Sequence, residues 1–476
     1  MRLNSFLIAA VALVAGCTVG PDYKPVEPDV PDEFVNVQSV DGATAVSVAG
    51  LWQSLGNDDL VRLIELAKQH NTTIAQAEAA LAESRALSGT IVYSLFPTGT
   101  INGNFERNSQ SSSDPFAFGG QGIVERYRAG FDATWEIDLF GSLRRESEAF
   151  VYRVEATEAN LYAVEIAIIA EVAQSYFEWR GATLRRELLK RNLRNQGDNV
   201  SILEAGFEAG RGTALDLARA RAVERTLAAT LPGAEAAVSR AEQRLSALTR
   251  LPVVALRDEL KAPTATIDLP SLIAVGQPVD WLLRRPDVRA AERRLAAATA
   301  DIGVEIAELY PKLNLIGDFG WTGRTSSAIG NSNAERWQVA PGLSWRILDY
   351  GRVRQTIKAS RARAAGALAA FDEAWLTALE ETENALANYT AATERAAILE
   401  EAALQGSEAA RLAKLRFDAG ADGYLSVVDA NRTQIELDDQ LALARTDRAT
   451  ALVALYKAVG GDFAEARYAT DVSAMR

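Results

Sequence analysis

The chain contains the same passage twice. Trp135–Gly141, with the sequence Trp-Glu-Ile-Asp-Leu-Phe-Gly, returns 210 residues later as Trp345–Gly351, with the sequence Trp-Arg-Ile-Leu-Asp-Tyr-Gly. Phe207-Glu-Ala-Gly210 returns as Phe417-Asp-Ala-Gly420 at the same offset, so the stretch between the two motifs recurs without insertion or deletion. Because one residue inserted into a helix rotates everything beyond it by about 100°, such a constant spacing predicts one long helix in each copy.

The only change in spacing falls upstream of the tryptophan. Phe96-Pro97 returns as Tyr310-Pro311 at an offset of 214 residues, so the second copy has lost four residues between this pair and Trp345. Loops accept such a deletion more easily than helices or paired strands do. Each repeat therefore predicts a loop-containing hairpin followed by a very long helix, a combination that is rare in soluble enzymes.

The N-terminus predicts export and lipidation. Arg2 and the apolar run 6–15 have the charge and length of a signal peptide, and the run ends in Val14-Ala-Gly-Cys17, which looks like a bacterial lipobox. We therefore expect cleavage before Cys17 and acylation of this cysteine, with several acyl chains that anchor the protein at roughly 0.8 kcal/mol per buried CH₂. Thr18, rather than an aspartate, follows the cysteine, which by resemblance to sorted lipoproteins implies the outer membrane. The alternative is an ordinary secretory signal that ends near a cysteine.

Composition excludes several classes of function. A formal net charge of −13 argues against nucleic-acid binding and would make any aqueous passage favour cations. One cysteine and one histidine, His70, cannot supply an internal disulfide or a zinc or copper site, so we expect no metal and no cofactor apart from the lipid. No apolar run of 18 residues follows the signal peptide, so no transmembrane helix is predicted.

Alternation of apolar and polar residues predicts two strands in each repeat. The apolar positions are Ile101, Gly103 and Phe105; Ala129, Phe131, Ala133, Trp135 and Ile137; Leu313, Leu315, Gly317, Phe319 and Trp321; and Val339, Leu343, Trp345 and Ile347. Each run has about the length of a tilted strand that crosses a bilayer, although the alternation alone fits a soluble sandwich equally well. Since about eight strands are needed to close a barrel, four spanning strands require an oligomer. Pro341 predicts a bulge or a position that donates no hydrogen bond.

Long helices are predicted over 142–205 and 352–416, each about 100 Å in length. Leu161, Val164, Ile168, Val172, Ser175 and Trp179 step by three or four residues and predict a coiled-coil-like seam. Each long helix ends in a glycine-containing turn that is followed by a return helix. Shorter helices, about 59–95 and 287–309, precede the first strand of each repeat.

These features together resemble the TolC-like outer membrane factors, in particular the OprM-like lipoprotein branch. The residues that carry the resemblance are Cys17–Lys24, Leu51–Leu60, Arg284–Arg289, Tyr310-Pro311, the stretch at Trp345, and Phe417–Arg432. The resemblance implies an α+β membrane protein that forms a homotrimer, with a 12-stranded transmembrane β-barrel, four strands from each protomer, continued by a long periplasmic α-helical barrel.

The resemblance also implies the function and the partners. Such proteins are passive exit ducts of tripartite efflux pumps, which open at the periplasmic tip when a periplasmic adaptor (membrane fusion) protein and an inner-membrane transporter, of the RND type or another, dock. The remaining partner is outer-membrane lipid, and nucleic acid is not expected. The alternative within this class is the outer-membrane duct of a type I protein secretion system.

Site residues follow from the same resemblance. Leu425 and Asp429 match the positions that narrow the periplasmic end of the duct, and Asp422 on the adjacent turn is a further gate candidate. A ring of three Asp429 carboxylates would select cations. On the sequence alone, a solvated helix residue is the favoured interpretation of Asp429, and it is the match over Gly420–Arg432 that favours the gate role. The expected adaptor-docking tips are centred on Gly210, Gly212, Gly420 and Gly423.

The predicted organisation is linear. It comprises a signal peptide (1–16), a lipid-anchored tether and equatorial segment (17–58), a first outer membrane efflux repeat (59–250), an equatorial inter-repeat segment (251–283), a second repeat (284–460) and a C-terminal equatorial tail (461–476).

Three other classes of protein fit the sequence less well than an export duct does. An enzyme would need a catalytic constellation, and the chain has no nucleophile elbow, P-loop or metal-spaced cluster, so we predict that the protein is not an enzyme. A stand-alone porin would need more strands and no helices of about 100 Å. A cytoskeletal coiled coil would leave the paired strands and the signal peptide without explanation.

Overall fold

The computed structural model describes residues 18–26, 30–31, 33–36, 50–109, 123–260, 267, 269–270, 278–282 and 284–461. The chain divides into two compact units, each assembled from three segments. Unit 1 comprises 1–27, 80–158 and 290–372, and unit 2 comprises 28–79, 159–289 and 373–476.

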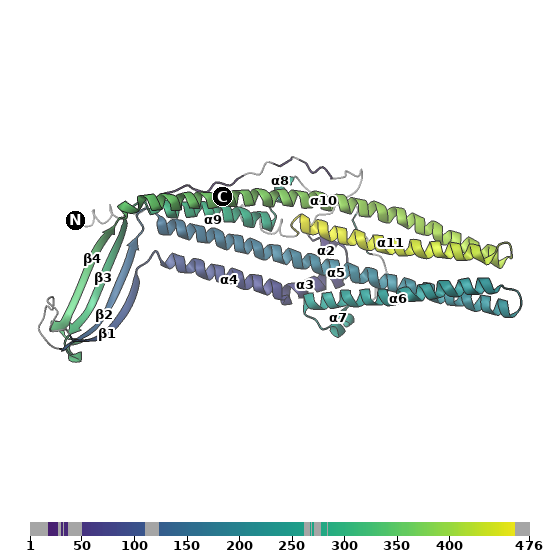
Figure 1. The fold of residues 1–476 in the computed structure, drawn as a ribbon, viewed down its shortest axis with the longest axis horizontal. Coiled ribbons are helices and arrows are strands. Elements are labelled where there is room, and N and C mark those ends of the chain that lie inside the picture. Colours follow the sequence, from purple (N-terminus) through teal and green to yellow (C-terminus); the bar gives the residue numbers. More distant parts are fainter. Residues whose placement is uncertain are drawn as a thin grey trace. The chain divides into compact units, whose positions relative to one another are not determined.

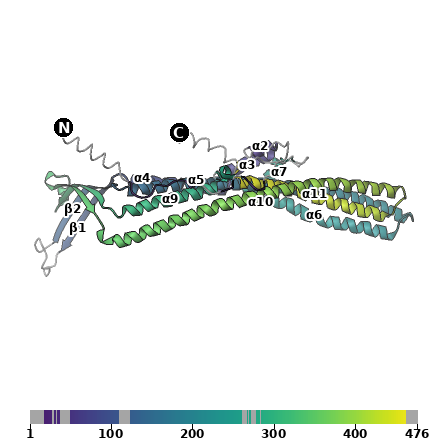
Figure 2. The same ribbon diagram turned by 90° about the horizontal axis from the view of Figure 1, so that it is seen from above.

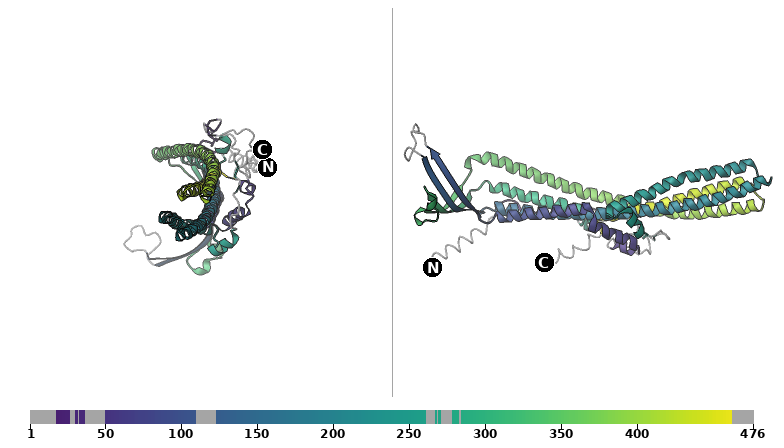
Figure 3. Two further views of the ribbon diagram at one scale, coloured as in Figure 1. Left: turned by 90° about the vertical axis from the view of Figure 1, so that its right-hand side faces the viewer. Right: turned by 90° about the horizontal axis from the view of Figure 1, so that it is seen from below.

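Unit 1 holds a four-stranded antiparallel sheet in the order β1-β2-β3-β4, and Figures 1 and 3 show the strands as one layer. The strands are β1 (Thr98–Ser109), β2 (Ile123–Ile137), β3 (Lys312–Gly323) and β4 (Glu335–Ser344), with short 3₁₀ turns at Ser326–Ala328 and Ser332–Ala334. Two strands come from each repeat, as the alternation predicts. The β2–β3 pairing, from Tyr127↔Gly323 to Ile137↔Leu313, joins the two repeats.

The fourth strand is shorter than predicted. Trp345 and Ile347 were expected to continue its alternation, but β4 ends at Ser344 and a 3₁₀ turn occupies Ile347–Asp349. Ser344 pairs with Lys312, the first residue of β3. Lys312 is preceded by Pro311, which has no N–H to donate. The ladder therefore has no partner for residues beyond Ser344.

Pro341 does not create a bulge. It pairs with Leu315, and the β3–β4 register continues from Lys312↔Ser344 to Trp321↔Glu335 without an extra residue. Strand β4 lies at the edge of the sheet, where a residue that cannot donate to a neighbouring strand is tolerated.

The long helices are confirmed: α5 (Ser142–Glu208) has 67 residues and α10 (Tyr350–Asp418) has 69. The return helices are α6 (Ala214–Thr249) and α11 (Tyr424–Ala458), and in Figures 1 and 2 each lies beside the end of its long helix. The remaining helices are α2 (Leu51–Ser54), α3 (Asp58–His70), α4 (Thr72–Tyr93), α7 (Val253–Glu259), α8 (Pro278–Leu282) and α9 (Pro286–Ala307). Within the described residues, no helix has both the length and the apolar character needed to span a membrane.

The helix predicted over 59–95 is broken in two. Asn71 has an extended backbone between α3 and α4. Its side-chain oxygen accepts a hydrogen bond from the Thr73 amide at 2.8 Å, and its amide nitrogen donates to the Leu248 carbonyl at 3.0 Å. An asparagine that bonds the backbone in this way replaces the helical hydrogen bond, so the helix stops and starts again.

The predicted seam of α5 lies in the core of unit 2. Five of its six residues are buried, and Val164 is half-buried. Close helix approach in this unit depends on small residues: a Cβ on Gly181 of α5 would lie 2.1 Å from Thr446 Oγ1 of α11. Trp52 of α2 packs against Tyr456 near the end of α11, with ring centroids 4.7 Å apart.

Candidate functional site: sheet faces and helix tips

The strand register places apolar side chains in rows across the sheet. Ile101, Phe131, Phe319 and Trp337 lie directly opposite one another on β1 to β4, and they are 85, 48, 44 and 74% exposed. Directly opposite residues share one face of a sheet, and positions two residues away along each strand share it too. The same face carries Phe105, Ala129, Ala133, Trp135, Leu313, Leu315, Trp321, Val339 and Leu343. In the part of the chain that the structure describes, no second sheet covers it.

The other face of the sheet is polar. Thr100, Asp132, Asp318 and Gln338 form the adjacent row. Asn102 donates a hydrogen bond to Asp132, and Arg336 forms an ion pair with Asp318. A sheet with an apolar face and a charged face fits a boundary between lipid and water.

Both helical hairpins end in the same turn. At the end of α5, the Gly210 amide donates to the Phe207 carbonyl at 2.9 Å, and Gly210 has φ +71°. At the end of α10, the Gly420 amide donates to the Phe417 carbonyl at 2.9 Å, and Gly420 has φ +69°. A left-handed glycine just after a helix ends it without steric cost, which explains why glycine occurs at both positions.

The two other tip glycines, Gly212 and Gly423, follow two residues after Gly210 and three residues after Gly420. Gly212 is exposed, and a Cβ there would lie 3.2 Å from the Phe207 amide nitrogen. Gly423 precedes α11 as its N-terminal cap and makes no side-chain cap hydrogen bond, whereas Thr213 caps α6 by accepting from the Asp216 amide.

A small hydrophobic core joins the two tips within unit 2. It consists of Val200 of α5, Leu217 and Ala220 of α6, and Tyr424 and Val427 of α11. Phe417 of α10 packs edge-on against Tyr424, with ring centroids 5.4 Å apart. The ends of all four helices are thus held together by one cluster.

The gate candidates lie on the other side of α11. Leu425 is 47% exposed and Asp429 is exposed, and their spacing of four residues places them on one helix face. Among the described residues, none forms a side-chain hydrogen bond or ion pair with the Asp429 carboxylate. Asp422 instead forms an ion pair with Arg416 at 3.2 Å, so it belongs to the turn rather than to the Leu425–Asp429 face.

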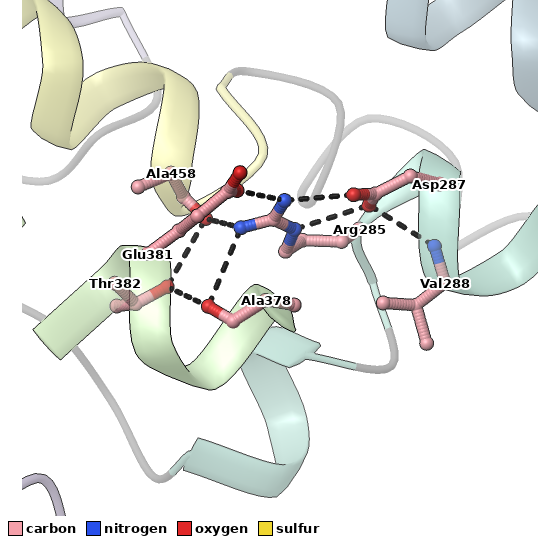
Figure 4. Close-up of polar contacts among 7 residues, drawn as sticks. All are labelled: Arg285, Asp287, Val288, Ala378, Glu381, Thr382 and Ala458. Atoms are coloured by element: carbon pink, nitrogen blue, oxygen red, sulfur yellow. Dashed lines mark hydrogen bonds and ion pairs between the residues drawn. The ribbon is translucent and has the colours of Figure 1, made fainter. Parts of the chain in front are cut away.

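Arg285 of the Arg284–Arg289 motif is a structural centre of unit 2 (Figure 4). Its side chain is 8% exposed. The guanidinium donates to the carbonyl of Ala458, the last residue of α11, at 2.7 Å, and pairs with Asp287 at 2.7 Å and Glu381 at 2.6 Å. Thr382 also donates to the Ala458 carbonyl, at 3.2 Å.

The electrostatics of this cluster favour its charged forms. Burial opposes the charge of Arg285, but the two carboxylates outweigh this effect and raise the pKa of its guanidinium. Burial also acts against the charge of Asp287, yet Arg285 holds the pKa of that carboxyl below its usual value. The sequence marked this motif only through resemblance, because apart from Asp287 the partners of Arg285 lie 96 and 173 residues away.

A cavity of about 830 Å³ lies among α5, α10 and α11, and carboxylates are among its lining side chains. An enzyme that uses acid–base catalysis would need such groups. Glu400 forms an ion pair with Arg445 at 2.7 Å. Burial raises the pKa of Asp438, and the nearby Arg191 opposes this shift. An ion pair accounts for Glu400, and the positive charge of Arg191 lies near Asp438.

A family model described as outer membrane efflux protein matches residues 63–249 and 278–461. The chain belongs to the outer membrane efflux protein family. This outer membrane efflux protein is 30% identical over 480 residues to the outer membrane protein OprJ of Pseudomonas aeruginosa, with 98% of each chain covered. It is 28% identical over 471 residues to the solvent efflux pump outer membrane protein SrpC of Pseudomonas putida, covering 97% of this chain and 98% of that one. The solved outer-membrane channel OprN superposes with a TM-score of 0.84 at 34% identity, covering 94% of this chain and all of that one.

Membership in this family confirms the resemblance to TolC-like factors, the α+β fold and the outer membrane location. The protein is a transport protein and not an enzyme. Cys17 lies outside the described residues, and its lipidation stays a prediction. The gate role of Leu425, Asp429 and Asp422 and the docking role of the tip glycines also stay predictions.

Trp337 is a site residue that the sequence analysis missed. It lies two residues before Val339, so the alternation that identified Val339 and Leu343 already includes it. The pairing Phe319↔Trp337 places it in the most aromatic row of the sheet.

Proposed function

We propose that three copies of this outer membrane efflux protein assemble into the outer-membrane exit duct of a tripartite efflux pump. The observation that carries the proposal is the exposed apolar row Ile101–Phe131–Phe319–Trp337, in a sheet whose edges β1 and β4 have no neighbour among the described strands. Unpaired strand edges are not tolerated in lipid, so the strands of other protomers must complete the sheet.

The number of strands supports a trimer. Closure of a barrel needs about eight strands, which one protomer with four strands does not supply. Three protomers give a barrel of about twelve strands, wide enough for an aqueous interior lined by the polar face. The strands have 10 to 15 residues, which suffices to cross the hydrocarbon core at a tilt.

The Leu425–Asp429 face of α11 is the proposed gate. Both side chains are exposed in the protomer, and a threefold axis beside this face would bring three leucines and three carboxylates together. The leucines would restrict the aperture by bulk, and the carboxylates would attract cations. The core that joins the tips, with Tyr424 and Val427 on the other side of the helix, would hold the ring in shape.

Docking of a periplasmic adaptor protein is assigned to the two tip turns. The turns at Gly210 and Gly420 have the same backbone geometry, so a trimer would present six similar knobs to an adaptor. The adaptor would link the duct to an inner-membrane transporter, of the RND type or another. A lipid on Cys17 would add a second attachment to the membrane.

Efflux of small molecules is favoured over type I protein secretion. The support comes from SrpC and OprJ, whose similarity extends over at least 97% of the chain, and SrpC is named for a solvent efflux pump. In cells that lack the protein, an efflux duct predicts several-fold higher accumulation of a fluorescent pump substrate and unchanged amounts of secreted protein in the medium. The reverse pattern would favour secretion.

The oligomer is tested by native mass spectrometry of detergent-solubilised protein. The expected mass is three times that of the mature chain. A stable monomer that retains its full strand content by infrared spectroscopy would refute the shared barrel.

A further inference from the structure

The cavity of about 830 Å³ in unit 2 lies along the contact between α5 and α11. Gly181 of α5 and Thr446 of α11 both line it, and a Cβ on Gly181 would lie 2.1 Å from Thr446 Oγ1, so the two helices touch there. Further along α5, Arg185 pairs with Asp439, which precedes Thr446 in α11. The helices are therefore antiparallel at this contact. The volume falls within the range of about 300–1,000 Å³ that small-molecule sites occupy.

One end of the cavity, which we call the arginine end, is positively charged. Its arginines are Arg180 of α5 and Arg445 and Arg448 of α11. The antiparallel contact places Arg180 at the level of Arg445. Among the described lining residues there are three carboxylates: Glu400 pairs with Arg445 at 2.7 Å, whereas Glu187 and Asp438 lie about two helical turns from Arg180 and Arg445. Three guanidinium groups and one carboxylate leave the arginine end with a net charge of +2.

The arginine end also has apolar walls, formed by Phe177 of α5 and by Ile267 and Leu269 of the inter-repeat segment. Two side chains of the second repeat hold this segment in place. Arg448 donates to the Leu269 carbonyl at 2.8 Å, and the Tyr389 hydroxyl of α10 donates to the Pro270 carbonyl. The wall is therefore tied to both α10 and α11.

One donor at the arginine end lacks an acceptor. The Nε atom of Arg448 is buried and has no hydrogen-bond partner among the described residues. A buried donor without a partner costs free energy, and an anion beside Arg448 would supply the missing acceptor.

We propose that the arginine end is a binding site for a small aromatic anion, a carboxylate or a sulfonate. Guanidinium groups donate paired hydrogen bonds to anionic oxygens, and their planes stack on aromatic rings. The net positive charge disfavours cations, and the apolar walls disfavour a small inorganic anion, which would lose its water without gaining apolar contacts. All the lining residues belong to one protomer, so the site does not depend on the proposed duct function.

A ligand in this site would join the two repeats. Helix α5 belongs to the first repeat, and α10 and α11 belong to the second. A molecule that contacts α5 and α11 together binds only the folded arrangement, so it should stabilise unit 2 in proportion to its concentration and affinity.

Two substitutions remove different parts of the site. Arg445→Gln removes one guanidinium group and leaves the Glu400 carboxylate in the cavity without its partner. Ala442→Phe keeps every charge and fills space, because Ala442 lines the cavity. The matched control is Arg395→Gln, which breaks the pair with Asp447 at 3.2 Å between the same two helices, α10 and α11, and outside the cavity lining.

Binding is measured on the full-length protein in lipid nanodiscs by saturation-transfer NMR, with naphthalenesulfonate as the probe and empty nanodiscs as the blank. Arg445→Gln and Ala442→Phe should each weaken binding at least about tenfold, and Arg395→Gln should stay within about twofold of wild type. Neutral naphthalenemethanol and inorganic sulfate should each bind at least about tenfold more weakly than the sulfonate, because each offers only half of what the site recognises. The sulfonate should raise the melting temperature of wild type and of Arg395→Gln, but not of the two cavity variants.

Three results would overturn the proposal. The first is the absence of saturable binding to wild type. The second is equal weakening by Arg445→Gln and Arg395→Gln, which would place any binding outside the cavity. The third is naphthalenemethanol that binds as tightly as the sulfonate, which would show an apolar cavity that does not recognise charge. If one cavity variant fails to fold, the other still decides, since one removes charge and the other removes space.

Discussion

The indole Nε1–H of Trp135 donates a hydrogen bond to the carbonyl oxygen of Leu95 at 2.9 Å. Trp345 makes the same bond to Leu309 at 3.0 Å. The first bond spans 40 residues and the second 36, and this difference of four is the deletion that separates the two repeats. Because the bond is kept while the intervening length changes, the deletion is absorbed inside the hairpin, and the contact between strand end and helix end is preserved in both copies.

A charge on the apolar face of the sheet should prevent membrane insertion. Phe319→Lys places an ammonium group in the middle of the apolar row and should cost about 2–4 kcal/mol if this face contacts lipid. Gln338→Lys, on the polar face of β4, is the matched control and should have little effect. The measurement is the folded fraction in lipid vesicles at increasing urea concentration. If the folded fraction falls equally in the two variants, the assignment of the apolar and polar faces of the sheet is contradicted.

Removal of the Asp429 carboxylate should change both conductance and selectivity. At an effective dielectric constant of about 20, two unit charges about 6 Å apart interact by roughly 3 kcal/mol, so a ring of three should attract cations. Asp429→Ala should raise single-channel conductance in planar bilayers and weaken cation selectivity. Leu425→Ala should widen the aperture and leave selectivity unchanged, because it removes bulk and no charge. If Asp429→Ala alters neither property, the constriction lies elsewhere.

Loss of Arg285 should destabilise unit 2 more than loss of an exposed arginine. Arg285→Ala leaves the Ala458 carbonyl without its guanidinium donor and separates Asp287 and Glu381 from their partner, which should cost about 2–3 kcal/mol. Arg395→Ala, which breaks the exposed pair with Asp447, should cost no more than about 1 kcal/mol. Thermal unfolding of the two variants measures the difference, and similar melting temperatures would refute the central role of Arg285.

Acid should weaken the same cluster. Arg285 lowers the folded-state pKa of Asp287, so the stability that this carboxylate contributes is present above its ordinary pKa and is lost as pH falls through the lower folded value. Asp287→Asn should therefore lower the melting temperature at pH 7, and the gap from wild type should narrow as pH falls below about 4. A gap that stays constant between pH 7 and pH 3 would exclude this linkage.

Removal of the half-buried carboxylate of Asp438 should stabilise the folded protein, whereas removal of the Asp287 carboxylate should destabilise it. Burial raises the pKa of this group, so its ionised form is disfavoured in the folded protein. Asp438→Asn should raise the melting temperature at pH 7 and have little effect at a pH where both the folded and the unfolded chain are protonated. A lower melting temperature at pH 7 would mean that Asp438 serves chiefly as the partner of Arg191.

Local patterns in the sequence determined the elements of this protein. Alternation with a period of two placed Phe131 and Phe319 on strands, and the absence of proline over 142–205 and 352–416 allowed the two long helices. Glycine at positions 210 and 420 marked the turns, because a left-handed backbone is needed there whatever packs around it. These strands, helices and turns depend on residues that are neighbours in the chain, which explains why the sequence alone was sufficient to predict them.

Tertiary structure decided what depends on distant residues. Alternation assigned each strand a face but not a register, and only the pairing brings Ile101, Phe131, Phe319 and Trp337 into one row. The same strand pairing ends β4 at Ser344, because β3 offers no partner beyond Lys312.

The same limit applies to two arginines that are buried in the described part of the chain. Arg285 reaches Ala458 across 173 residues of chain, and Arg145 reaches Asp22 across 123. No periodicity or local motif encodes such contacts, since they exist only after the helices have packed. The sequence therefore determined which helices and strands form, and the packing of those elements decided which side chains hold them together.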